Sequence, residues 1–235
     1  MNKKKKIFFG LGISIVSLIL IAFIGFFIYA SIYYKAEDGA LKLLEEEYVE
    51  KKDGYILINS NEPTDTMFIF YPGAKVEEEA YLPILVQIRE GGITCVLVEM
   101  PFRMAILDQS AADEIINEYE HSYDNFYIGG HSMGGAAASS YAAKNQDKIE
   151  GLILLGAYMY GDYSPADTLT IYGSLNQSVE DKIDYTENVI EIEGGNHAQF
   201  GNYGHQKGDA YATITASEQQ SIASTAIIDF INARI

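Results

Sequence analysis

Residues Asn125–Tyr141 read NFYIGGHSMGGAAASSY. A short run of strand-forming residues, Phe126–Ile128, comes first, and small helix-forming residues follow from Ala136. Between them lies the pattern G-x-S-x-G, with Ser132 at its centre. A strand, a glycine-flanked serine and a helix in this order are typical of a nucleophile elbow, a tight turn that strains the serine backbone. The stretch therefore predicts that Ser132 is a nucleophile.

Strands and helices alternate along the rest of the chain. The predicted strands, besides the elbow strand, are Tyr55–Asn59, Met67–Tyr71, Ile93–Met100, Ile149–Ala157, Thr168–Gly173 and Asn188–Glu193. The predicted helices, besides the elbow helix and a short polar one between the last two strands, are Glu77–Glu90, Asp108–Tyr119 and Thr215–Ile235. Apolar strands alternating with helices predict an α/β domain, a mostly parallel central sheet with helices on both faces. In such a sheet the site lies at the carboxyl ends of the strands.

The N-terminus carries a candidate membrane anchor. Four lysines, Lys3–Lys6, precede Ile7–Tyr34, which contains no charged residue. Its most apolar part, Ile7–Ala30, is long enough as a helix to cross the roughly 30 Å hydrocarbon core of a bilayer. Only a poor cleavage site follows, so we favour an uncleaved anchor over a cleaved signal peptide. The lysines predict a cytoplasmic N-terminus and place the rest of the chain outside.

This pattern divides the chain into four parts. We expect a cytoplasmic basic tail over 1–6, a transmembrane anchor over 7–34 and a single α/β domain over 54–235. The charged segment 35–53 has apolar residues at helical spacing, which predicts either a stalk or a helix packed on the domain edge.

The charge of the chain bears on its binding partners, and its cysteine content bears on disulfides. All 33 acidic residues follow Tyr34, together with only 12 of the 16 basic residues. So acidic a surface repels nucleic acid. The single cysteine, Cys95, excludes an intrachain disulfide.

Two backbone N–H groups are candidates for binding an oxyanion. One belongs to Met133, at the start of the elbow helix. The other belongs to Ala74, in the turn Tyr71-Pro72-Gly73-Ala74 after the strand Met67–Tyr71. The alternative for this turn is an ordinary Pro-Gly connection.

A general base must come from one of four histidines. His197 and His205 both lie in Gly194–Gly208, after the last predicted strand, and His197 is the closer of the two to that strand. A base reaching back over the sheet edge therefore fits His197 better. His131, inside the elbow, is expected to shape the pocket, and His121 to be solvated.

The elbow motif Gly130–Gly135, the turn Tyr71–Gly73 and the stretch Gly195–Gly201 together resemble the α/β-hydrolase superfamily. More narrowly, they resemble small membrane-anchored bacterial hydrolases related to dienelactone hydrolases. The resemblance covers roughly 55–235 and implies a single α/β-hydrolase domain. Dienelactone hydrolases proper use a cysteine nucleophile, so Ser132 points to the serine esterases.

One position departs from the pattern of the superfamily. The triad acid normally follows the next-to-last strand in a Gly-x-x-Asp sequence, but here the sequence is Gly173-Ser174-Leu175-Asn176. An asparagine can orient a histidine, but it carries no charge to stabilise an imidazolium. Asp162, Glu180 and Asp181 are the possible substitutes.

The predicted function is a membrane-anchored extracytoplasmic serine hydrolase, an esterase or related acyl hydrolase. Its substrate would be a small molecule or an acyl group of the cell envelope, and no metal or other cofactor is implied. The sequence leaves the oligomeric state open. It also leaves two alternatives, a catalytically weakened hydrolase that acts as a binding or scaffold protein, and an acyltransferase on the same fold.

Overall fold

The structure, a computed structural model, describes the backbone of residues 3–234 and the side chains from Ser14 onward. Met1 and Asn2 of the predicted basic tail, and Ile235, lie outside the described residues. By internal contacts the chain divides into two units, Met1–Tyr33 and Tyr34–Ile235.

The first unit contains a single helix, α1 (Lys3–Ser31). Its stretch Ser14–Ser31 is long and apolar enough to cross a membrane, and only 6% of that stretch is buried. Because a signal sequence near an N-terminus has the same properties, the helix is compatible with either an anchor or a signal.

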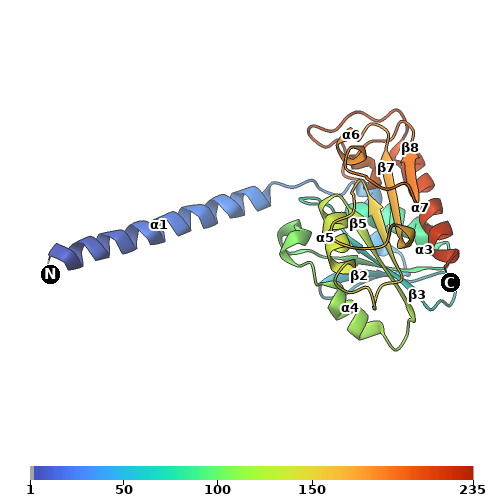
Figure 1. The fold of residues 1–235 in the computed structure, drawn as a ribbon, viewed down its shortest axis with the longest axis horizontal. Helices are drawn as coiled ribbons and strands as arrows, with labels where there is room; N and C mark the ends of the chain where they lie inside the picture. The colour runs from blue at the N-terminus through green and yellow to red at the C-terminus, as the bar shows by residue number, and fades with distance from the viewer. Residues whose placement is uncertain (1–2, 235) are drawn as a thin grey trace. The chain divides into compact units, whose positions relative to one another are not determined.

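The second unit is built on an eight-stranded sheet, with strand order β1-β2-β4-β3-β5-β6-β7-β8 (Figure 1). All neighbours from β4 to β8 run parallel, whereas β1 and β2 are antiparallel additions at one edge. The predicted mostly parallel sheet is thus confirmed. The strands are β1 (Val49–Lys51), β2 (Tyr55–Ile58), β3 (Thr66–Tyr71), β4 (Thr94–Val98), β5 (Asn125–His131), β6 (Gly151–Leu155), β7 (Thr168–Gly173) and β8 (Val189–Ile192).

Helices cover both faces of the sheet. The helices α3 (Leu82–Arg89) and α7 (Ala216–Asn232) pack in one core cluster with Phe68 and Phe70 of β3. The helices α4 (Ala112–Tyr119) and α5 (Met133–Ala142) pack in a second cluster, which contains Met67, Ile69 and Tyr71. Successive side chains of β3 therefore enter opposite cores, as the two-residue period of a strand requires. Full burial of such a side chain contributes roughly 1.5–3 kcal/mol.

Shorter elements complete the connections. They are α2 (Asp38–Leu41) and α6 (Gln177–Glu180), and the single 3₁₀ turns η1 (Lys42–Glu45), η2 (Glu78–Tyr81), η3 (Pro101–Arg103), η4 (Ala105–Leu107), η5 (Pro165–Asp167) and η6 (Ala198–Phe200).

Two predicted helices differ from those observed. In segment 35–53 the helical part ends at Glu45, and Val49–Lys51 forms the edge strand β1, paired with β2. Sheet pairing here overrides the helical spacing of the apolar residues. The helix predicted from Asp108 begins at Ala112, because Asp108 has a non-helical backbone (φ −148°, ψ 73°) and the Ala112 N–H donates to the Tyr71 hydroxyl (2.8 Å).

The loops that carry the candidate residues all leave the carboxyl ends of strands. Ala74 follows β3, Ser132 follows β5, Asn176 follows β7 and His197 follows β8. Since these strands are parallel, their carboxyl ends lie along one edge of the sheet.

Candidate active site

Ser132 joins β5 to α5 in a strained conformation, with φ 54° and ψ −120°. A side chain is rarely tolerated at such a positive φ. The flanking glycines are needed because the backbone is crowded here. A Cβ on Gly130 would lie 2.5 Å from the Tyr71 carbonyl oxygen, and one on Gly134 would lie 2.1 Å from the same atom. The elbow geometry predicted for this stretch is therefore present.

The same crowding brings the predicted oxyanion turn against the elbow. A Cβ on Gly134 would also lie 2.4 Å from the Pro72 carbonyl oxygen, so the turn after β3 presses on the first turn of α5. Ala74 is flanked by two residues whose N–H groups are occupied: Gly73 donates to the Tyr81 hydroxyl and Lys75 to the Arg103 carbonyl. Within the described part of the chain, the N–H groups of Ala74 and Met133 donate to no protein acceptor.

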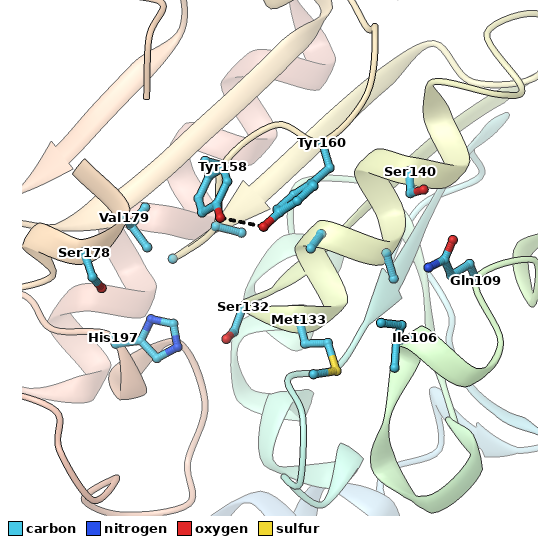
Figure 2. A pocket seen from close by; sticks show the side chains of 14 residues that line it. Ile106, Gln109, Ser132, Met133, Ser140, Tyr158, Tyr160, Ser178, Val179 and His197 are labelled. Carbon is cyan, nitrogen blue, oxygen red and sulfur yellow. Dashed lines mark hydrogen bonds between the residues drawn. The ribbon is translucent and has the colours of Figure 1, made fainter. Parts of the chain in front are cut away.

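His197 directly precedes the turn η6 and faces the elbow. Figure 2 shows the Ser132 hydroxyl pointing toward the His197 ring, and both residues line the same cavity. Burial lowers the pKa of His197 below its usual range, against an opposing effect of the Asp209 carboxylate. The ring is therefore neutral at pH 7, as a general base must be.

Asn176 contacts His197 directly. Its side-chain amide lies 2.7 Å from Nδ1 of the ring, and its other terminal atom accepts from the Ser178 hydroxyl (3.0 Å). A half-turn of the amide exchanges its oxygen and nitrogen between these two partners without losing either contact. With the oxygen on Nδ1, the ring proton sits on Nδ1 and leaves Nε2 free to accept the serine proton. That orientation is the one that base chemistry requires.

The three alternative acids lie away from His197. Asp162, Glu180 and Asp181 are exposed, and among the described residues none of them contacts His197. Of the candidates, the structure therefore brings only Asn176 to the orienting position.

His131 lies outside the cavity lining, in contrast to its predicted role in shaping the pocket. It is buried and links two other residues. The Tyr81 hydroxyl accepts from the Gly73 N–H (3.1 Å). It donates to His131 Nδ1 (2.8 Å), because the proton of the neutral ring lies on Nε2, which faces a carbonyl oxygen. His131 Nε2–H then donates to the His197 carbonyl oxygen (2.9 Å). Burial holds the pKa of His131 well below its usual range, so this link is uncharged. It ties the turn after β3, the elbow and the His197 loop together.

His205 is not part of this arrangement. It is exposed and stacks on Tyr211, with ring centroids 4.2 Å apart. The preference for His197 over His205 agrees with this placement.

A cavity of about 500 Å³ opens at Ser132. Its walls are largely apolar or small, and Figure 2 shows the rings of Tyr158 and Tyr160 on one side and Ile106 on the other. The two tyrosines stack at 4.8 Å and share a hydrogen bond between their hydroxyls. The remaining lining residues include Met133, Ala136, Ala137, Ala157 and Val179.

Comparison with protein families gives an independent result. A sequence model described as "Alpha/beta hydrolase family" matches residues 67–221. The chain belongs to the alpha/beta hydrolase family. No curated protein sequence matches it.

Solved structures share the fold at low identity. One is carboxyl esterase 2 from the fungus Tuber melanosporum, with a TM-score of 0.56 and 14% identity, covering 77% of this chain and 82% of the esterase. Another is Est1E from Butyrivibrio proteoclasticus, with a TM-score of 0.55 and 13% identity, covering 80% of this chain and 97% of Est1E. A third is a monoglyceride lipase from Saccharomyces cerevisiae, with a TM-score of 0.55 and 9% identity, covering 80% of this chain and 94% of the lipase. At these identities the similarity establishes the fold alone.

Two residues that the sequence did not single out join the site. Tyr81 carries the buried hydrogen bonds described above. Asp209 accepts from the His197 N–H (3.3 Å) and the Ala198 N–H (2.8 Å). Neither lies in a motif, and only their contacts in the folded chain reveal them.

Proposed function

We propose that this chain is a serine hydrolase that cleaves carboxylic esters with an apolar acyl group. One observation carries the proposal: Ser132, strained at the elbow, faces His197 in an apolar cavity, and Asn176 holds the far nitrogen of that ring.

The reaction follows from this arrangement. The Ser132 oxygen attacks the ester carbonyl carbon while Nε2 of His197 takes the hydroxyl proton. The carbonyl oxygen becomes an oxyanion, which accepts hydrogen bonds from the N–H groups of Ala74 and Met133. Collapse of this intermediate breaks the bond to the alcohol, which leaves with the proton from His197. A water then attacks the acyl-serine while His197 takes one of its protons. The bond between the acyl carbon and the Ser132 oxygen breaks, that oxygen takes the proton from His197, and the carboxylic acid leaves.

The cavity suggests the size of the acyl group. A volume of about 500 Å³ lies within the range of small-molecule sites. Its apolar walls favour an acyl chain or an aromatic acid over a charged group. The structural neighbours are consistent with this class, since one of them, Est1E, has been solved with ferulic acid bound.

A panel of esters with acyl chains from acetate to palmitate tests the function on the full chain in detergent. We expect kcat/KM to rise from acetate to medium chains, as apolar contacts with the cavity walls accumulate. If no ester in the panel is hydrolysed, the proposal is wrong.

We further propose that α1 anchors the protein, with the hydrolase domain outside the cytoplasm. The run Lys3–Lys6 and the apolar stretch Ser14–Ser31 support this orientation. Protease added to cells stripped of their wall should digest the domain and leave α1 in the membrane. A domain that resists the protease, or one released into the medium without α1, would contradict the anchor.

A second candidate function is a binding or scaffold protein with weak catalysis. Its support is that the partner of His197 Nδ1 is the uncharged amide of Asn176. It predicts a Ser132 that is not activated, and the covalent probe described at the end of the Discussion separates the two.

A further inference from the structure

His197 has an unusual electrostatic setting for a base of this kind. As the base accepts a proton it becomes an imidazolium, and it does so in a largely buried place. Its Nδ1 partner is the amide of Asn176, which carries no charge. A buried charge without an opposite charge nearby is strongly unfavourable. The site therefore needs a negative group close to this ring.

The Asp209 carboxylate is hydrogen-bonded to the backbone of the loop that carries His197. Its Oδ2 accepts from the Ala198 N–H (2.8 Å), and its Oδ1 accepts from the N–H groups of His197 (3.3 Å) and Ala210 (2.9 Å). Three backbone donors thus fix the carboxylate against the residue that carries the base.

Few other ionisable groups surround the Asp209 carboxylate and the His197 ring. Asp209, Asn176 and His197 line a second cavity of about 420 Å³ behind the ring. The other charged residue of that cavity is Lys207. On the inner side, the neutral His131 ring lies with its centroid 4.6 Å from that of His197. The Asp209 carboxylate raises the pKa of His197, which burial lowers.

We propose that Asp209 supplies the negative charge that Asn176 lacks, acting through space on the His197 imidazolium. The proposal rests on the function proposed above. The usual two roles of a triad acid are then divided: Asn176 orients the ring, and Asp209, a positioning residue that does not touch the reacting atoms, stabilises its charge.

The first test does not depend on activity. The pKa of His197 is measured by NMR in the full chain in detergent, for the parent and for Asp209→Asn. The variant keeps one acceptor oxygen for the His197 and Ala210 N–H groups, loses the oxygen that accepts from the Ala198 N–H, and removes the charge. The pKa of His197 should therefore fall by about half a unit or more. An unchanged pKa would overturn the proposal, whether or not the protein hydrolyses esters.

The second test is a double-mutant cycle on kcat with a medium-chain ester. Asp209→Asn should lower kcat about tenfold in the parent, and the acid limb of kcat/KM should move to lower pH with the pKa of His197. Asn176→Asp restores a charge beside the ring and should raise kcat about tenfold. In that background Asp209→Asn should cost about twofold or less, because the charge is already present.

Equal losses in both backgrounds would mean that Asp209 only holds the loop in place, and this would overturn the proposal. The control is Asp184→Asn, at an exposed carboxylate outside both cavities, which should leave kcat and the pKa of His197 unchanged. If the parent hydrolyses no ester, the proposed function fails, and the NMR measurement still decides on Asp209.

Discussion

Ser132→Ala is expected to lower kcat for ester hydrolysis by about 10³-fold or more. Removing the serine of a complete triad costs about 10⁶ in another hydrolase, but a neutral partner on the histidine already makes the parent slower. The residual rate would come from the oxyanion donors and from substrate binding. Because the change removes one oxygen that projects into a cavity, the thermal unfolding midpoint should stay close to that of the parent.

Ser217→Ala, on the exposed side of α7, is the matched control and should leave kcat unchanged. Hydrolysis by the Ser132 variant at the parental rate would exclude the proposed nucleophile.

Gly134→Ala is expected to destabilise the domain by more than about 3 kcal/mol, and the variant is expected to lose activity. Its Cβ would lie 2.1 Å from the Tyr71 carbonyl oxygen and 2.4 Å from that of Pro72, and neither backbone atom can move without disturbing β3. Urea denaturation of the full chain in detergent measures the loss.

Gly39→Ala in α2 is the control for this substitution, because nothing lies within 4 Å of its added Cβ. A helical position of this kind should gain up to about 1 kcal/mol. Equal stability of Gly134→Ala and the parent would show that the elbow and the turn after β3 are not packed as described.

Local sequence was enough to predict the centre of the molecule. The elbow depends on neighbours in the chain, because the two glycines, the serine and the flanking strand and helix lie within one short stretch. The position of Asn176 followed from the Gly-x-x-Asp pattern of the superfamily that the chain resembles, and the structure brings it to His197. In both cases the parallel strands converge on one edge, so chain order predicts proximity.

Features that depend on distant contacts were missed. The edge strand β1 exists because β2 offers it a partner, and the spacing of apolar residues before it indicated a helix instead. Tyr81 and Asp209 act through hydrogen bonds to residues of other loops, and no pattern in the sequence marks them. His131 was expected to shape the pocket but does not line the cavity at Ser132, since the G-x-S-x-G pattern does not reveal which way its variable side chain points.

The central claim is that Ser132 is an activated nucleophile, and a covalent fluorophosphonate probe tests it most directly. The full chain in detergent is treated with the probe, digested, and mapped by mass spectrometry. We predict one adduct, on the peptide that contains Ser132, which is absent from Ser132→Ala and strongly reduced in His197→Ala. A parent chain that remains unlabelled, or an adduct on another serine, would contradict the account.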